Sequence, residues 1–284
     1  MIECKVFVHS PGAGRLDLAR CVLLNAGIPE QDIAENTCKG KKYLSVFLPS
    51  ARRARVLYER IRSLRLNGIS LSVSVLKDAD WKTRWKRYFK PFFITSDVRV
   101  IPVWEKKSVA ASDRAIYLDT TFAFGTGLHA TTQMMARFIE SAAGHCQRFL
   151  DIGTGTGILS IIAARYGARF IHAFDIDADS VKTARNNFRM NHCVTGYVDA
   201  IDFKHYTTKE RFDFVAANLL TEDLIFFQKK MAGMVKPGGY LAVSGIFHEN
   251  YSYLRRSFKP SGFRCLKVSH KKGWYAVLFR KDTV

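Results

Sequence analysis

The sequence has neither a long apolar run nor closely paired cysteines, and these two absences exclude several classes of protein. No apolar stretch reaches the ~18 residues that a membrane-spanning helix requires. Residues Met1–Lys5 lack the basic and then apolar pattern of a signal peptide. The six cysteines are scattered without a Cys-x-x-Cys pair. We therefore expect a reducing, cytoplasmic location and no metal site built from cysteines.

Acidic residues are scarce relative to basic ones. The 284 residues include 25 Asp and Glu against 44 Lys and Arg, which gives a formal net charge of +19. Such an excess is typical either of a solvated basic surface or of a face that contacts RNA or an acidic protein. Residues 119–245 carry 13 basic and 12 acidic side chains, whereas residues 246–284 carry 9 and 2. The excess therefore lies outside the long middle segment.

Residues 1–77 alternate between strand-like and helix-like patterns. The expected order is strand, helix, strand, strand, helix, strand, which predicts a small ferredoxin-like α+β domain. That fold hosts many functions and by itself licenses no activity. The expected strands are 4–8, 33–38, 43–48 and 69–75, the second and third joined by a turn at 39–41, and the expected helices include Leu16–Leu24 and Val56–Leu64.

Residues 78–118 form a basic and aromatic segment that we interpret as a linker between domains. Rings and cations that alternate in this way are typical of single-stranded nucleic acid contacts. A linker helix that packs its rings on both domains and exposes its charges explains the same pattern. A strand is expected over 98–104, with a partner over 115–119. The alternating residues are Trp81, Lys82, Arg84, Trp85, Lys86, Arg87, Tyr88, Phe89 and Lys90.

Residues 119–284 read as a single α/β domain. Strands and helices alternate there in the pattern of a parallel sheet covered by helices, a Rossmann-like architecture. Two late strands, 264–268 and 274–279, predict a terminal antiparallel hairpin. The other expected strands are 148–152, 170–175, 195–198, 212–218 and 240–244, and the expected helices are 133–141, 158–166, 180–190, 224–234 and 254–258.

A glycine loop carries the central chemical signal. Gly153, Gly155 and Gly157 follow an expected strand and open an expected helix. Glycines permit a tight turn and let backbone N–H groups approach a ligand closely. The spacing is neither the dinucleotide fingerprint nor the phosphate loop, which ends in Lys and Ser or Thr. Without a phosphate to neutralise, this pattern favours S-adenosylmethionine.

Two acidic residues at the ends of the next strands support this prediction. Asp175 lies 22 residues after Gly153, where a carboxylate can accept hydrogen bonds from both ribose hydroxyls. Asp199 follows the third strand and is placed to meet the adenine edge, although a turn residue is the simpler explanation. Asp177 and Asp179 are expected to be solvated or to cap a helix.

Asn218 ends the fourth expected strand and is the candidate catalytic residue. At this position an Asn carbonyl can orient an amine by accepting its hydrogen bond. Methyl transfer is an in-line displacement, so positioning and desolvation dominate. An Asn that only satisfies a loop is the alternative interpretation.

The loop over residues 122–132 precedes the helix that leads into the sheet. Its glycines and threonines can fold over a cofactor and bind the carboxylate or amino group of its methionine end. His129 invites a general-base role, while a helix-capping loop with a packed His explains it equally well. The candidate cofactor contacts here are Phe124, Gly125, Thr126 and Thr132.

Together these residues resemble the PrmA family, the methyltransferases of a large-subunit ribosomal protein (L-eleven). The resemblance covers nearly the whole chain, and its most specific parts are the Phe-Gly-Thr-Gly-x-His-x-Thr-Thr loop and the Ala-Asn-x-Leu segment. The residues that carry it are Trp81, Trp85, Phe89, Pro91, Trp104, Phe124–Gly127, His129, Thr131, Thr132, Gly153–Leu159, Asp175–Asp177, Asn186, Asn187, Ala217, Asn218, Leu220 and Ser244–Ile246.

The resemblance implies a cofactor, a target and a role for each domain. It places S-adenosylmethionine contacts at Thr132, Gly153, Asp175 and Asn218. It also implies that residues 1–77 dock the ribosomal protein and that lysine ε-amines and the N-terminal α-amine are methylated. Three alternatives stay open: an RNA methyltransferase that uses the basic linker, a protein-lysine methyltransferase with another target, and a non-catalytic ribosome-binding protein.

Overall fold

The computed structural model divides the chain into two compact units, Met1–Tyr88 and Phe89–Val284. Each unit is described by itself. Residues 90–118, predicted as part of the linker, belong to the second unit where they are described. The structure describes residues 2–8, 33–38, 41–48, 69–75, 90–108, 114–120 and 125–283, and helical residues at 19, 23, 55, 57–59 and 61. The rings and cations predicted over 81–89 lie outside these residues.

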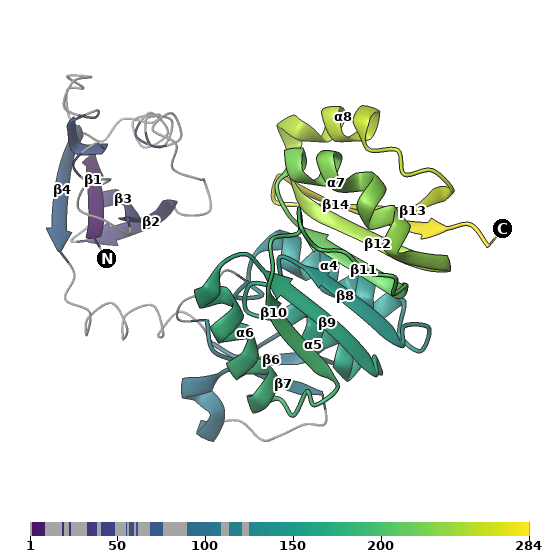
Figure 1. Ribbon diagram of the computed structural model, residues 1–284. Helices are drawn as coiled ribbons and strands as arrows, with labels where there is room; N and C mark the ends of the chain where they lie inside the picture. The colour runs from purple at the N-terminus through teal and green to yellow at the C-terminus, as the bar shows by residue number, and fades with distance from the viewer. Residues whose placement is uncertain are drawn as a thin grey trace. The chain divides into compact units, whose positions relative to one another are not determined.

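The first unit contains a four-stranded antiparallel sheet (Figure 1). Its central strand β1 pairs with β3 on one side and β4 on the other, and β2 pairs with β3. This is the strand order that the predicted ferredoxin-like fold requires, so the prediction is confirmed for the sheet. The strands are β1 (Ile2–Val8), β2 (Ile33–Cys38), β3 (Lys41–Leu48) and β4 (Ile69–Val75).

The core of the first unit follows from the two sequence periods. Cys4 and Val6, two residues apart on β1, are both buried, as the alternation of a strand demands. Leu57 and Ile61 are four residues apart and also buried, which is the spacing of one helix face. One apolar sheet face and apolar helix stripes thus account for the core here.

A three-stranded sheet opens the second unit. Strand β6 (Arg99–Pro102) pairs antiparallel with β5 (Phe92–Phe93) and parallel with β7 (Ala115–Leu118). The strand predicted over 98–104 is too long, because Val103–Ser108 form a 3₁₀ helix, η3. Pro102 is the last paired residue, and a proline has no N–H with which to continue a ladder.

The edge of β7 that faces away from β6 is held by two side-chain amides, one within α6 (Ala178–Met190) and one directly after it. Asn191, just after the helix, donates to Tyr117 O (2.6 Å) and accepts from Tyr117 N (2.7 Å). Asn187 makes the same pair of hydrogen bonds with Asp119, at 2.9 and 2.8 Å. Both amides are buried and stand in for the backbone of a missing neighbouring strand.

The main sheet has seven strands in the order β10-β9-β8-β11-β12-β14-β13 (Figure 1). Strands β10, β9, β8, β11 and β12 run parallel to one another, and β14 lies antiparallel between β12 and β13. The predicted parallel sheet and terminal hairpin are confirmed. The strands are β8 (Arg148–Ile152), β9 (Phe170–Asp175), β10 (Gly196–Ala200), β11 (Phe212–Asn218), β12 (Val235–Phe247), β13 (Phe263–Lys271) and β14 (Trp274–Lys281).

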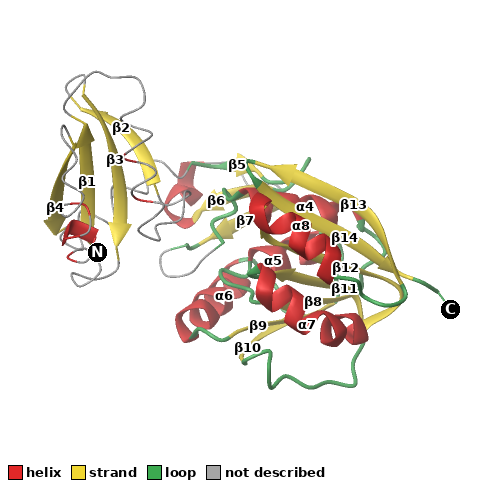
Figure 2. Cartoon of the chain, turned by 90° about the horizontal axis from the view of Figure 1, so that it is seen from above, coloured by secondary structure: helices red, strands yellow, loops and turns green. Residues whose placement is uncertain are grey.

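Helices flank this sheet (Figure 2). Because the strand order reverses between β8 and β11, right-handed crossovers place the helices before and after the reversal on opposite faces. Within the described residues, no helix is long and apolar enough to cross a membrane. Besides α6, the helices are α4 (Ala130–Ser141), α5 (Ile158–Arg165), α7 (Thr221–Met234) and α8 (His248–Ser257).

The start of α4 differs from the prediction. The helix was expected from Gln133 but begins at Ala130, and Gln133 N donates to the carbonyl of His129 at 3.1 Å. Thr131 and Thr132 therefore lie in its first turn, where both are buried. Threonine side chains are tolerated in a first turn, because the backbone N–H groups there have no intrahelical hydrogen bonds with which a hydroxyl would compete.

We predict that Asn191→Ala lowers the free energy of unfolding by about 2–4 kcal/mol, because two buried backbone groups of Tyr117 lose their partners. Urea unfolding followed by circular dichroism measures the change. Asn186→Ala, on the less buried side of α6, is the matched control and should change stability by no more than about 0.5 kcal/mol. Equal effects of the two variants would contradict the bracing role.

Candidate cofactor and methyl-transfer site

The turn after β8 forms the floor of the candidate site. Gly153, Gly155 and Gly157 have φ values of 71°, 54° and 81°, a backbone conformation that residues other than glycine rarely adopt. The N–H groups of Gly153 and Thr154 both donate to Phe174 O at 3.0 Å. The predicted turn is thus present, and its first residues are fixed to the neighbouring strand β9.

The buried carboxylate of Asp151 fixes the conformation of this turn. Oδ2 of Asp151 accepts hydrogen bonds from the hydroxyls of Thr154 (2.8 Å) and Ser160 (2.6 Å). Burial raises the pKa of Asp151 to about 6, although both hydroxyls oppose the shift. Asp151 therefore joins the turn to the first helical residues of α5. The sequence analysis gave it no role.

Asp175 lies directly beside the glycine turn. Its Oδ2 accepts from Gly155 N at 2.9 Å, and its Oδ1 accepts from Asp177 N at 3.0 Å. Each carboxylate oxygen keeps further lone pairs, which a vicinal diol can use. The carboxylate of Asp177 accepts from the N–H groups of Asp179 and Ser180, which confirms the predicted cap of α6.

Asp199 has different neighbours. Its carboxylate is 3.2 Å from Nε2 of His172 and 3.9 Å from the guanidinium of Arg185. The strand register sets Ala200, rather than Asp199, opposite Asp175. Side chains alternate across a strand, so Asp199 projects from the other face of the sheet. The adenine contact proposed for Asp199 stays a prediction.

The loop before α4 lies on the glycine turn. The hydroxyl of Thr156 donates to Gly125 O at 2.7 Å, and a Cβ at Gly125 would come within 2.9 Å of that hydroxyl oxygen. Likewise, a Cβ at Gly127 would lie 2.8 Å from Cδ1 of Ile158. Thr126 uses its hydroxyl to accept from Leu128 N within the loop. Phe124 lies outside the described residues.

Asn218 meets the first turn of α4. Its Nδ2 donates to Oγ1 of Thr131 at 3.2 Å, and that oxygen is 2.7 Å from Nδ1 of His129. The ring of His129 packs edge-on against Trp274, with centroids 5.0 Å apart. Burial lowers the pKa of His129, and the nearby cation of Lys272 lowers it further. The two predicted catalytic residues are thus linked through Thr131, whose hydroxyl the sequence analysis assigned, with the other threonines of its loop, to the methionine end of the cofactor.

The loop after β11 closes over the glycine turn. Leu219 N donates to Ser244 O at 3.1 Å, and a Cβ at Gly153 would lie 2.7 Å from Cδ2 of Leu219. Gly245 has φ of 92°, and any Cβ there would collide with the carbonyl of Leu219. Gly245 therefore lets β12 pass beneath this loop, which sets the position of Asn218.

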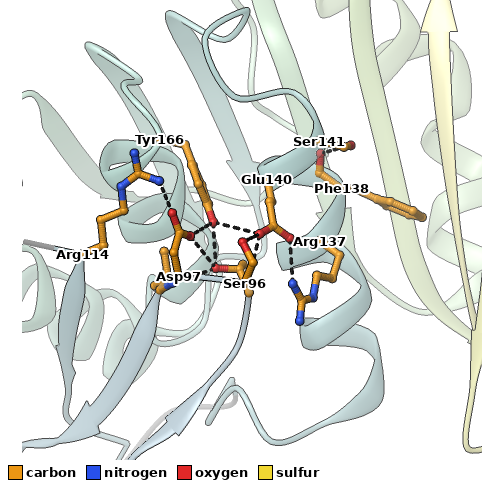
Figure 3. A network of polar contacts seen from close by, with 10 residues as sticks. Ser96, Asp97, Arg114, Arg137, Phe138, Glu140, Ser141 and Tyr166 are labelled. Carbon is orange, nitrogen blue, oxygen red and sulfur yellow. Dashed lines mark hydrogen bonds and ion pairs between the residues drawn. The ribbon is translucent and has the colours of Figure 1, made fainter. Parts of the chain in front are cut away.

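A polar network supports the candidate site from the side of the small sheet (Figure 3). The Tyr166 hydroxyl lies 2.7 Å from Oγ1 of Thr95 and 2.5 Å from Oδ1 of Asp97, and Ser96 N donates to Glu140 at 2.8 Å. Burial, followed by the Asp97 hydrogen bond, raises the pKa of Tyr166 to about 12. Arg114 pairs with Asp97 and Arg137 with Glu140.

This network fastens the turn between β5 and β6 to α4 and α5. The strand and the turn supply Phe92 and Ile94, whose side chains would lie 3.1 and 3.2 Å from a Cβ at Gly127. The loop over the glycine turn therefore rests on a fixed apolar support. The sequence gives no signal for this arrangement, because the contacts that join its separate segments span 17 to 71 positions along the chain.

The residues present fit S-adenosylmethionine. Oγ1 of Thr132 is buried and has no hydrogen-bond partner among the described residues, so it can take a polar group of a ligand. The N–H groups of Gly153, Gly155 and Gly157 are used within the fold, so these glycines provide a backbone without side chains that a ligand can approach closely. Asp175 offers carboxylate lone pairs at the carboxyl ends of the strands, where ligands of such sheets bind. No cluster of three or more metal-ligating side chains occurs within the described residues.

The sheet order with its antiparallel insertion, the glycine turn and the acidic residue at the end of β9 define a Rossmann-like methyltransferase. The profile of the family described as "Ribosomal protein L11 methyltransferase (PrmA)" matches residues 17–282. The chain belongs to this family of S-adenosylmethionine-dependent methyltransferases, as the resemblance predicted.

Individual relatives agree. "Ribosomal protein L11 methyltransferase" of Bacillus cereus (strain B4264) is 31% identical over 267 residues, which cover 92% of this chain and 81% of the relative. The protein of the same name from Staphylococcus aureus (strain JH1) is 35% identical over 219 residues, covering 76% and 69%. The solved ribosomal protein L11 methylase of Lactobacillus delbrueckii subsp. bulgaricus has a TM-score of 0.62 at 25% identity, covering 68% of this chain and 99% of that one.

We predict that Asp151→Asn removes a pH dependence of stability. Burial raises the pKa of the native carboxyl to about 6, whereas the unfolded one titrates at the ordinary aspartate pKa of 3.8. The wild-type free energy of unfolding should therefore fall relative to the variant between about pH 4 and 6, by about 3 kcal/mol in total. Urea titrations across this range measure it, with the exposed Asp179→Asn as control. Parallel pH profiles of wild type and Asp151→Asn would refute the burial effect.

Proposed function

We propose that this chain transfers methyl groups from S-adenosylmethionine to amines of ribosomal protein L11, at lysine ε-amines, the N-terminal α-amine or both. The observation that carries the proposal is the placement of Asn218 beside the glycine turn, with its Nδ2 bound to Thr131. Its Oδ1 is then left as an acceptor for the N–H of an incoming amine. The names of the relatives support the choice of target.

Distinct parts of the chain would hold the cofactor. We assign the ribose hydroxyls to Asp175 and the methionine end to the hydroxyl of Thr132 and the loop with Gly125 and Thr126. The backbone of the glycine turn lines the space between them. Phe124 and Asp199 stay candidate contacts. When bound, S-adenosylmethionine supplies an electrophilic methyl group on a sulfonium sulfur.

The protein's contribution to the transfer is positioning and the exclusion of water. The amine must be neutral, because its nitrogen lone pair forms the new bond. Asn218 Oδ1 accepts one N–H and so aims that lone pair, and the restricted geometry lowers the entropic part of the barrier. Leu219 covers Gly153, which keeps water from this part of the site.

An amine target fits this site better than a nucleic acid base. Asn218 is followed by Leu219 and Leu220, so the segment offers no aromatic ring on which a flipped base can stack. Leu220 is 68% exposed and supplies only an aliphatic contact at this point. Methylation of RNA is therefore an outcome that the assay below must exclude.

The two ends of the chain supply the surfaces for partners in this proposal. The domain at residues 1–77 docks the ribosomal protein, and the basic segment 78–118 and the tail contact neighbouring ribosomal RNA. Strand β13 supports the second part, because it is mostly exposed at the sheet edge and carries Arg264, Lys267 and Lys271. Cys146, Cys193 and Cys265 are thiols that form no disulfide, which agrees with the reducing cytoplasm that we propose as the location.

The proposal predicts where a labelled methyl group appears. Wild-type protein incubated with methyl-labelled S-adenosylmethionine, purified ribosomal protein L11 and ribosomal RNA should place the label on amines of the protein, as mass spectrometry locates it. An L11 preparation with all its amines acetylated is the matched negative control. Label in the RNA alone would overturn the proposal.

We also predict that Asp175→Ala abolishes measurable cofactor binding without unfolding the protein. Loss of two charge-assisted hydrogen bonds, each about 1.5–3 kcal/mol, corresponds to at least roughly 100-fold in Kd. Calorimetric titration with S-adenosylmethionine measures it, and Asp179→Ala, also beside the start of α6, serves as the control. An unchanged Kd for Asp175→Ala would remove the ribose assignment.

A further inference from the structure

Three side chains from two distant segments form one hydrogen-bonded row. His129 precedes α4, Thr131 lies in its first turn, and Asn218 ends β11, 87 positions further along the chain. The Thr131 oxygen is 3.2 Å from Nδ2 of Asn218 and 2.7 Å from Nδ1 of His129. Only 1% of the Thr131 side chain is exposed, so water does not compete for its hydroxyl.

The chemistry of these groups restricts the direction of the hydrogen bonds. An amide has a nitrogen that only donates and an oxygen that only accepts, whereas a hydroxyl donates a single proton. If Asn218 Nδ2 donates to Thr131, the hydroxyl proton is free to point toward Nδ1 of His129. A neutral imidazole with its proton on Nε2 accepts there, and all three groups are satisfied.

With the opposite orientation of its amide, Asn218 would present a different group to the target. Asn218 Oδ1 would then accept the Thr131 hydroxyl, and Nδ2 would face the target. An amide N–H cannot accept a hydrogen bond from an amine, and two donors would oppose each other. The orientation of one amide therefore decides whether Asn218 can hold an amine.

We infer that Thr131 is a positioning residue that sets the amide orientation of Asn218, with His129 as the acceptor that fixes the direction of the Thr131 hydroxyl. This inference rests on the proposed function, since it concerns the acceptor that Asn218 presents to the amine. His129 acts in it through Thr131 and takes no proton from the target.

The surroundings of His129 agree with an accepting ring. Burial disfavours the imidazolium, and the neighbouring Lys272 cation disfavours it as well, so the pKa of His129 lies below its usual value. Trp274 packs on the ring edge-on and limits its rotation. A neutral ring in a fixed orientation keeps an acceptor nitrogen toward Thr131.

The neighbouring threonine provides a contrast. Oγ1 of Thr132 is equally buried but has no partner within the described part of the chain, and we assign it to the cofactor. The two adjacent hydroxyls thus have separate duties, one toward Asn218 and one toward the ligand. Removing the Thr131 hydroxyl should therefore leave the affinity for the cofactor unchanged. A general distortion of the start of α4 would lower that affinity.

The test removes the hydroxyl without changing the shape of the side chain. Thr131→Val should lower kcat for methylation of ribosomal protein L11 by about 30-fold or more, keep the Kd for S-adenosylmethionine within about threefold, and leave Tm nearly unchanged. Thr131→Ser restores the hydroxyl and should recover most of kcat. In an Asn218→Ala background, Thr131→Val should cause no further loss, because its effect passes through the amide.

A second measurement is independent of activity. In ¹⁵N spectra of the whole protein, the side-chain amide of Asn218, assigned by its absence in Asn218→Ala, should show one slowly exchanging proton. In Thr131→Val that proton should exchange rapidly. If wild type methylates no amine, the proposed function fails, while these spectra still decide the orientation. Unchanged kcat or unchanged exchange in Thr131→Val, or the same loss in the Asn218→Ala background, would overturn the inference.

Discussion

The buried hydrogen bonds of Asp151 are the constraint on which the site depends. They hold Thr154 and Ser160 on one carboxylate and so fix the turn between β8 and α5. A turn with three glycines has more conformational freedom than any other, so its shape must come from such contacts. Because the carboxylate is fully enclosed, its charge has a cost that these hydroxyls and the backbone N–H of Ser160 offset in part.

The rest of the site is attached to this turn in sequence. Gly155 N reaches Asp175 and thereby sets the neighbouring strand end, while the Thr156 hydroxyl binds the carbonyl of Gly125. The carbonyl of Thr156 also accepts from Asn187, which in turn braces β7. A displacement of the turn would therefore move the loop before α4 and the edge of the small sheet together. This coupling explains why residues far apart in the chain lie in register at one edge.

Much of the fold follows from the sequence because it depends on local patterns. The β8 strand is a short segment with apolar residues directly before the glycine turn, and its predicted bounds are those observed. The glycine spacing and Asp175 were found because strand ends can be recognised locally. The start of α4, the 3₁₀ helix after Pro102 and the braces at Asn187 and Asn191 were not predicted. The two braces depend on partners 68 and 74 positions away in the chain, and no apolar periodicity marks where the two helices begin.

The same distinction applies to the site. Asn218 and His129 could be singled out by residue type and position. Their link through Thr131 depends on the start of α4, which lies three residues before the start that the apolar periodicity predicts. The sequence also could not show that β14 inserts between β12 and β13. That insertion carries Trp274 to His129 and Lys272 near it.

The insertion of β14 also brings one cation of the basic tail close to the candidate site. The excess charge of the chain lies outside residues 119–245, yet the turn that joins β13 to β14 returns Lys272 to the site. A nearby cation disfavours a second positive charge, which is why it lowers the pKa of His129. If the proposed amine binds at Asn218, which is joined to His129 through Thr131, we expect the same cation to favour the neutral form of that amine. Only the neutral form has the lone pair needed for methyl transfer, so the position of Lys272 suits the proposed chemistry.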